Sequence, residues 1–323
     1  MVFSFYNSFY FLFRCKSVNF MVLFSFFFFW LCLIAYGLFD KNYSSYQFLY
    51  IKHCTLSFNL QYSIGFGLDG IGFIFIFLTT FLFILTFLTG LKYNLFFIYE
   101  YFFCLFSLEI FLIAVFSAID LISFFFLFES VLIPMFLIIG LWGSVNRKVY
   151  AGLLFFLFTL LGSIALLFII LILFYDYGTL NFNLLNKIEI KTSKEIFLWF
   201  LGFISFGVKV PIFPFHIWLP EAHVEAPSVG SVILAGILLK LGGYGIIRIL
   251  LFIFSNGCFF FLPFVYMLCS LSILYASFTA LRQFDLKRII AYSSIAHMNL
   301  ILLGLFSNRA SVRHFFISFF VII

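Results

Sequence analysis

Long runs of apolar residues, separated by short polar turns, dominate this chain of 323 residues. A helix needs about 20 mostly apolar residues, each adding about 1.5 Å, to cross the hydrocarbon core of a bilayer. By this rule the sequence predicts a short apolar run, then nine spans, then the start of an eleventh segment. These segments fall at 1–13, 18–39, 64–90, 95–118, 120–142, 149–175, 196–215, 227–254, 258–281, 289–306 and from about 314 onward.

The composition favours a membrane protein for the same reason. Apolar residues make up 65% of the chain and charged residues 9%, whereas soluble domains carry roughly 25% charged residues. A surface in contact with water needs more polar side chains than this sequence has. The predicted fold is therefore an all-α, polytopic transmembrane bundle of about ten helices plus the start of an eleventh.

The basic residues are spread thinly, and no run of five or six like charges indicates a nucleic-acid partner. If the spans alternate in direction, one group of basic residues shares one side, which we predict faces the matrix or cytoplasm. The other side keeps five lysines, partly offset by Glu189 and Glu195, so the bias is modest. The first group is Arg14, Lys16, Lys92, Arg147, Lys148, Arg282, Lys287 and Arg288, and the second is Lys41, Lys52, Lys187, Lys191 and Lys194.

No motif in the sequence predicts a bound cofactor. The six cysteines never have the C-x-x-C spacing of a metal or redox site, and no GxGxxG or Walker loop follows a strand-like pattern. Any redox cofactors are therefore expected in partner proteins. The first residues lack the features of a transit or signal peptide, and the 58 phenylalanines suggest an AT-rich organelle genome.

Three ionisable residues fall near the middle of predicted spans: Glu129, Lys209 and Lys240. Each costs from about 2.5 kcal/mol upward at the bilayer centre, so each needs a reason to be there. One interpretation is a set of structural ion pairs that fix helix order. The other is a lateral proton relay, in which a Glu129–Lys209 pair that can form and break acts as a proton switch.

The stretch 205–230 concentrates polar residues and prolines around Lys209. Pro211 and Pro214 each remove a backbone donor, so we predict that the helix breaks there and that "HIWLPEAHVEAP" connects the spans on the basic side. The cluster of His216, Glu221, His223 and Glu225 is a metal alternative, but Pro220 interrupts the zincin-like spacing.

Two further features lie inside the later spans. "LGGYG" at 241–245 is either a phosphate nest or a site of close helix contact, and its apolar setting favours helix contact. His297 is either an ordinary packing residue or a proton carrier, since imidazole titrates near neutral pH.

Several long blocks of this sequence closely resemble the subunit 4 family of NADH–ubiquinone oxidoreductase, respiratory complex I. The blocks are "VKVPIFPFHIWLPEAHVEAPSVGSVILAGILLKLGGYGIIR" (208–248), "FESVLIPMFLIIGLWG" (128–143) and "AYSSIAHMNLILLGLF" (291–306). "FGLDGIGFIFIFLTTF" (66–81) and "LEIFLIAVFSAIDLISFFF" (108–126) extend the similarity. These antiporter-like subunits are also similar to components of multisubunit Na⁺/H⁺ antiporters.

The resemblance implies two inverted five-helix repeats, each with a discontinuous helix and a midplane charge. Glu129 matches the family's essential glutamate, Lys209 its paired lysine, Lys240 its connecting lysine and His297 a relay histidine. It also implies supporting roles for six residues, which are His216, His223, Glu225, Pro211, Pro214 and Asp69.

The resemblance further implies a division of the chain into four segments. These are N-terminal transmembrane segments at 1–63, long helices at 64–119, a first half-channel core at 120–254 broken near 209–214, and the incomplete start of a second repeat at 255–323. Family members have about fourteen helices, so the chain is expected to be a fragment, the product of a split gene whose second chain carries the other helices, or a short assembly element.

The expected function is proton translocation in the membrane arm of complex I, with EC number 7.1.1.2 for the whole complex. NADH, FMN, iron–sulfur clusters and ubiquinone would bind partner subunits, and neighbouring antiporter-like subunits and membrane lipids would contact this chain. The expected location is the mitochondrial inner membrane, ahead of a bacterial plasma membrane. The alternative function is a subunit of a cation/proton antiporter.

Overall fold

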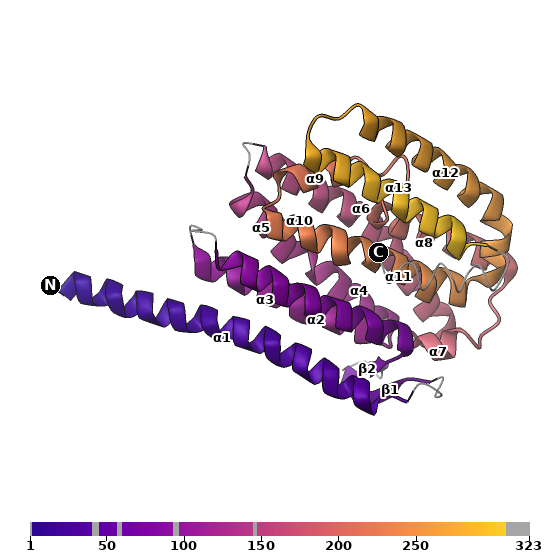
Figure 1. The fold of residues 1–323 in the computed structure, drawn as a ribbon. Coiled ribbons are helices and arrows are strands. Elements are labelled where there is room, and N and C mark those ends of the chain that lie inside the picture. Colours follow the sequence, from indigo (N-terminus) through magenta and orange to yellow (C-terminus); the bar gives the residue numbers. More distant parts are fainter. Residues whose placement is uncertain (1, 41–44, 57–59, 93–96, 145–146, 308–323) are drawn as a thin grey trace.

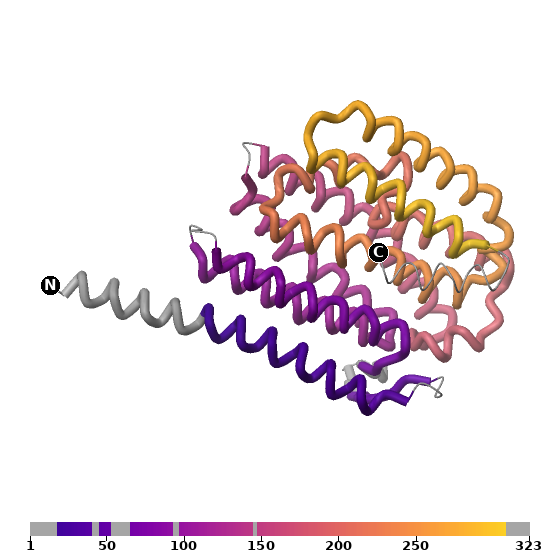
Figure 2. Tube along the Cα trace, viewed as in Figure 1, coloured from indigo at the N-terminus to yellow at the C-terminus, as the bar shows by residue number. Residues whose placement is uncertain are grey.

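The computed structural model describes residues 2–40, 45–56, 60–92, 97–144 and 147–307, and of these it leaves the side chains of 2–17, 53–56 and 60–64 undescribed. Its trace reverses direction repeatedly, so that long helices lie side by side (Figures 1 and 2). Within the described residues, eight helical stretches are long and apolar enough to cross a membrane. They are Val18–Leu38, Gly70–Gly90, Ile98–Ser117, Leu121–Trp142, Lys148–Tyr177, Ser228–Leu251, Ser255–Leu281 and Leu286–Leu305. The predicted all-α membrane bundle is confirmed.

The N-terminal region differs from the prediction of two separate apolar segments. A single helix, α1, runs over Val2–Leu38 along the flank of α2 and α3 (Figure 1). The sequence between the two predicted segments, 14–17, contains neither Gly nor Pro, so no residue there interrupts a helix. The side chains of Arg14 and Lys16, the whole of Lys41 and the segment predicted from 314 lie outside the described part of the chain.

A β-hairpin follows α1 and was not predicted. Its last residues, from 64 onward, were expected to begin a helical span. Strands β1 (Gln47–Leu56) and β2 (Leu60–Leu68) pair antiparallel, with an irregularity between Gln47 and Tyr50. The hairpin is fastened to the bundle at Gly65, whose N–H donates to Asp120 Oδ2 at 2.7 Å and whose carbonyl accepts from Ile119 N at 3.1 Å. This pairing keeps the chain extended as far as Leu68.

Four helical crossings follow the hairpin. They are α2 (Gly70–Gly90), α3 (Ile98–Ser117), α4 (Leu121–Ser130) with α5 (Leu132–Trp142), and α6 (Lys148–Tyr177). The prediction for 120–142 was one helix, but the structure divides it at Val131, two residues after Glu129. Together α4 and α5 still make a single apolar crossing.

The later elements complete the described bundle. They are α7 (Phe182–Leu185), α8 (Thr192–Lys209), α9 (Trp218–Glu225), α10 (Ser228–Ile233), the π-helical turns η1 (Leu234–Leu238) and η2 (Ile246–Leu251) on either side of α11 (Leu239–Gly245), α12 (Ser255–Leu281) and α13 (Leu286–Leu305). In Figure 1, α12 and α13 cover the side of the bundle opposite α1.

Basic residues gather at one end of the bundle, as the alternation of spans predicts. There Lys287 Nζ donates to the carbonyls of Val224 at 3.2 Å and Ala226 at 2.9 Å, and Ser144 N donates to Glu225 O at 3.0 Å. The lysines of the segment after α6 lie at the other end (Figure 1). Which membrane face the basic end meets stays a prediction.

Glu195, counted from sequence only as a charge that offsets lysines, joins two helices. It lies in the first turn of α8 and is buried. Its Oε1 accepts from the backbone N–H groups of Asn256 at 2.7 Å and Gly257 at 3.3 Å, and its Oε2 accepts from the Asn256 side chain at 2.9 Å. These N–H groups belong to the first turn of α12, which has no cap from its own Phe254. Glu195 therefore caps α12 from a neighbouring helix.

Replacing Glu195 with alanine should destabilise the chain by about 1–3 kcal/mol, because buried N–H groups lose their acceptor and the helix dipole loses its counter-charge. Glu195→Gln keeps one acceptor oxygen and should fall between the parent and the alanine variant. Thermal unfolding of the purified chain in detergent measures both, with the exposed Glu189→Ala as control. Equal midpoints for all variants would contradict the capping role.

Candidate functional site

The break after α8 lies where the sequence predicted it, at Lys209. Val210 N makes a last helical hydrogen bond to Phe206 O at 2.8 Å, and Pro211 has no N–H with which to continue the helix. Carbonyls freed at the break are bonded from elsewhere: Trp218 Nε1 donates to Val208 O at 2.9 Å, and Asn299 Nδ2 approaches Pro211 O at 3.5 Å. Interrupted helices are tolerated at membrane depth when such partners exist.

Lys209 is buried in this region, with 5% of its surface exposed. Its Nζ lies 3.7 Å from the centroid of the Phe128 ring, which provides a cation–π contact. Glu129, the next residue, lies beside Ser163 of α6 and interacts electrostatically with Lys209. No direct ion pair joins the two side chains in the described part of the chain, and Glu129 Oε1 is buried without a hydrogen-bond partner there. The two charges are thus close enough to influence each other without being locked together.

Lys240 belongs to a different helix, which packs against the same break. It is buried in α11, the short α-helical stretch between η1 and η2. Its helix lies tightly against α8, because a Cβ at Gly242 would come within 2.7 Å of Val210 Cγ2 and 3.0 Å of Lys209 Cβ, and one at Gly245 would overlap the Phe206 ring. The prediction that "LGGYG" serves close helix contact is confirmed. Glycines here bring the Lys240 helix against the Lys209 break.

The π-helical turns around Lys240 were not predicted. Each inserts one extra residue per turn and shifts the face that the following side chains present. Such turns are uncommon and occur frequently at functional sites.

The polar segment after the break is largely helical and buried rather than a loop. α9 covers Trp218–Glu225, so the predicted connection "HIWLPEAHVEAP" contains a helix where a loop was expected. Pro220 does not interrupt α9 because it lies in the first turn, where a missing N–H costs no hydrogen bond. His223 and Glu225 are each 3% exposed at the basic end.

His216 lies between the broken ends of the helix. Its ring lies 5.0 Å from that of Tyr275 and 5.7 Å from that of Phe213, so it is enclosed by aromatic side chains. In the described residues, no three His, Cys, Asp or Glu side chains converge as a metal centre requires.

His297 is placed differently from the other predicted relay residues. It is exposed on α13, whereas Met298 and Asn299 beside it are buried. The structure therefore does not bring His297 into contact with the buried lysines among the residues it describes, and its relay role stays a prediction.

Asp69 has two partners that explain its position. Its Oδ1 accepts from Gly72 N at 3.2 Å and caps α2, and its Oδ2 accepts from Arg248 Nη1 at 2.9 Å. The guanidinium also faces the ring of Tyr46 at 5.0 Å. Burial raises the pKa of Tyr46 to about 12, so its hydroxyl stays neutral beside the cation at physiological pH. Arg248 was not singled out from the sequence, although a charge at the end of an apolar span was visible there.

Glu109 is a second buried acid that the sequence analysis missed. It is fully buried in α3, and its Oε1 accepts from Ser25 Oγ of α1 at 3.3 Å. A charge about eleven residues into an apolar run was the available signal.

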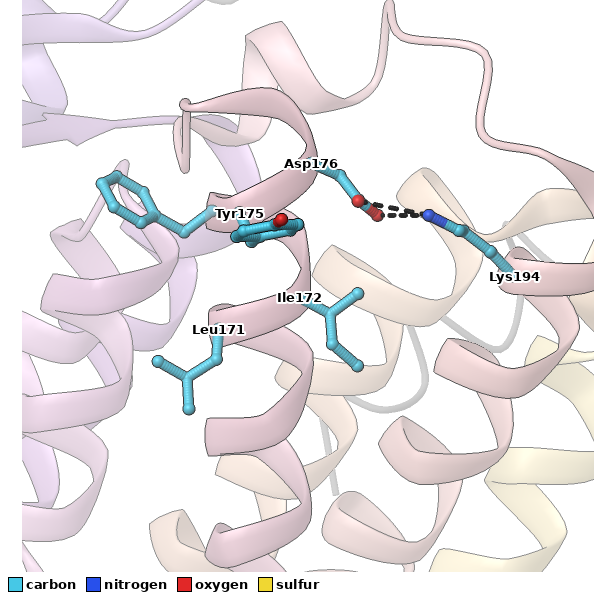
Figure 3. A pocket seen from close by; sticks show the side chains of 6 residues that line it. Leu171, Ile172, Tyr175, Asp176 and Lys194 are labelled. Atoms are coloured by element: carbon cyan, nitrogen blue, oxygen red, sulfur yellow. Dashed lines mark hydrogen bonds and ion pairs between the residues drawn. The ribbon is translucent and has the colours of Figure 1, made fainter.

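A surface pocket lies away from this buried site, where α6 ends and α8 begins, at the end of the bundle opposite the basic end (Figure 3). Leu171, Ile172 and Tyr175 form its apolar wall. Above them, Asp176 and Lys194 make an ion pair of 3.0 Å, which Figure 3 shows crossing from one helix to the other. Because both partners are partly exposed, this pair contributes little to stability.

The sequence model of a family described as NADH:quinone oxidoreductase/Mrp antiporter, transmembrane, matches residues 118–322. The chain belongs to this family. The matched range contains Glu129, Lys209, Lys240 and His297, while Asp69 and the hairpin precede it.

The chain is also similar in sequence to individual curated proteins. The NADH-ubiquinone oxidoreductase chain 4 of Chondrus crispus is 49% identical over 278 residues, which are 85% of this chain and 56% of that protein. The chain 4 of Arabidopsis thaliana is 47% identical over 275 residues, 85% of this chain and 55% of that protein. The chain spans about half the length of the curated relatives it matches.

Two solved structures share the fold. A chain of respiratory complex I from Thermus thermophilus superposes with a TM-score of 0.80 and 25% identity, over 95% of this chain and 68% of that one. A chain of the archaeal membrane-bound sulfane sulfur reductase gives 0.82 with 21% identity, over 94% and 63%, which shows the fold alone. The chain is thus a multi-pass membrane member of the family.

Proposed function

We propose that this chain translocates protons in the membrane arm of NADH–ubiquinone oxidoreductase. One observation carries the proposal: a buried lysine, Lys209, ends a broken membrane helix beside an aromatic ring and within electrostatic reach of Glu129. A buried cation without a fixed counter-ion can give up or regain its proton when the nearby acid moves. This is the property that a proton switch needs.

The proposed route follows the buried ionisable residues. Protons would reach Lys209 and Glu129 from the basic end, past the buried His223 and Glu225, and pass laterally to Lys240. Tight contact between Gly242 and the break makes the helices of the two lysines direct neighbours, which supports a route from one to the other. His297 remains the proposed continuation on α13.

The rest of the complex would supply the energy. In this proposal NADH, FMN, iron–sulfur clusters and ubiquinone bind partner subunits, and neighbouring antiporter-like subunits and lipids cover the exposed apolar faces. The relatives' printed names, NADH-ubiquinone oxidoreductase chain 4, support this assignment. We place the chain in the mitochondrial inner membrane, with its basic end toward the matrix.

A cation/proton antiporter is the second candidate, because the description of the matching family includes antiporters. The two functions differ in what drives transport. Proton movement that requires Na⁺ and proceeds without NADH oxidation would favour the antiporter.

Replacing Glu129 with glutamine should lower NADH-driven proton translocation by roughly 100-fold or more, since a positioned proton-transfer group contributes about 10²–10⁴ to a rate. Glutamine has nearly the same shape and cannot carry the charge, so assembly should persist. Initial rates of acidification in membrane vesicles measure the effect, with the exposed Glu189→Gln as control. An unchanged rate of proton translocation in assembled Glu129→Gln would contradict the proposal. Loss of assembly would instead favour a structural ion pair.

A further inference from the structure

Asn299 is the polar residue through which α13 reaches the broken helix. It is fully buried, although His297, two residues earlier, is exposed. Its Nδ2 donates to Ile295 O of its own helix at 2.8 Å and approaches Pro211 O in the broken segment at 3.5 Å. The second contact joins parts of the chain 88 residues apart.

The chemistry of these partners fixes the orientation of the amide. Both are carbonyl oxygens, which only accept hydrogen bonds, so the NH₂ end of Asn299 must face them. Its Oδ1 then points elsewhere, and it has no hydrogen-bond partner within the described chain. A buried amide oxygen in that condition is costly, and buried water molecules commonly bond such groups.

This oxygen lies next to the broken segment that carries Lys209. Pro211 lies two residues after Lys209, and Gly242 brings the Lys240 helix against the same break. Three helices, α8, α11 and α13, therefore meet at the point where backbone carbonyls are released.

We propose that Asn299 is a positioning residue of the proton path: its amide NH₂ holds the broken segment at Pro211, and its Oδ1 binds a water molecule that extends the path from Lys209 toward α13. This inference rests on the proposed proton translocation and adds to it a residue that the relay of charged groups does not contain. It requires a neutral side chain with both a donor and an acceptor.

The first test is Asn299→Leu, which keeps a similar volume and removes both hydrogen-bonding groups. We expect the initial rate of NADH-driven proton translocation in vesicles to fall about two- to tenfold, the ratio that corresponds to one net hydrogen bond. Ser272→Ala is the matched control, because Ser272 is also buried and its hydroxyl donates to Cys269 O of its own helix, its one hydrogen bond within the described residues. Equal rates for assembled Asn299→Leu and parent would overturn the proposal.

Asn299→Asp gives a readout that a purely structural role does not move, and it applies even if the leucine variant fails to assemble. An ionised carboxylate cannot donate to Pro211 O, whereas the protonated acid can donate there and still accept from water. The rate of this variant, divided by the parent rate at each pH, should therefore rise as the pH falls. A ratio that does not change with pH would overturn the proposal.

The two proposals can fail separately. Lys209→Met measured in the same vesicles reports on proton translocation by this chain. If Lys209→Met abolishes pumping and both Asn299 variants behave like the parent, only the role of Asn299 is wrong. If Lys209→Met leaves pumping unchanged, the proposed function itself is wrong.

Discussion

Lys209→Met should abolish proton translocation while the helix bundle remains assembled. Methionine has an unbranched side chain of similar length, so it can occupy the space beside the Phe128 ring without a charge. The variant also removes a cation from an apolar interior, which relieves a cost rather than adding one. We expect initial rates of NADH-driven acidification to fall by roughly 100-fold or more.

The same helix offers a matched control. Lys194 lies in the first turn of α8, at the opposite end from Lys209. Its side chain is about half exposed, and its Nζ pairs with Asp176 Oδ2 at 3.0 Å. Exposed pairs of this kind contribute about 0–1 kcal/mol, so Lys194→Met should leave both assembly and pumping near the parent level. Similar losses in both variants would show that the charge of α8, and not the position of Lys209, matters.

A double variant tests whether Glu129 and Lys209 act together. If they form one switch, Glu129→Gln/Lys209→Met should pump no worse than either single variant, because residues that act as a unit give non-additive losses. Multiplied losses would instead indicate two independent steps.

The part of this site that is local in sequence was predictable. Pro211 removes a backbone donor two residues after Lys209, so a break there follows from covalent structure alone. Glu129 and Lys240 were visible because a charge is rare within an apolar run. None of these inferences needed a contact between distant residues.

Features that depend on distant contacts were not predictable in this way. Glu195 caps a helix that begins 60 residues later, and Asp69 and Arg248 are 179 residues apart. The hairpin at 47–68 was not predicted: residues 47–63 were assigned to no span, residues 64–68 were taken as the beginning of one, and pairing between the two strands decided the outcome. His297 shows the converse, since its position in an apolar run did not reveal which face of α13 it occupies.

The Asp69–Arg248 pair carries the largest expected effect on stability. It lies at the non-basic end, with side chains only 18% and 13% exposed, and Arg248 Nε and Nη2 have no hydrogen-bond partner in the described chain. The aromatic rings around the guanidinium exclude water, so Asp69 is its main compensation. Removing one member of a buried ion pair costs about 3–5 kcal/mol, because the other charge stays buried.

Asp69→Ala should therefore have the lowest unfolding midpoint of the variants at this pair. It removes the ion pair and also the α2 cap, which is worth about 1 kcal/mol. Asp69→Asn keeps a cap oxygen and loses the charge, which separates the two contributions. Adding Arg248→Met to Asp69→Ala should recover most of the loss, because no unpaired cation remains. Thermal unfolding midpoints in detergent measure all three. If the double variant is less stable than Asp69→Ala, Arg248 stabilises the fold through its ring contacts, and the pair is not the dominant interaction at this end of the bundle.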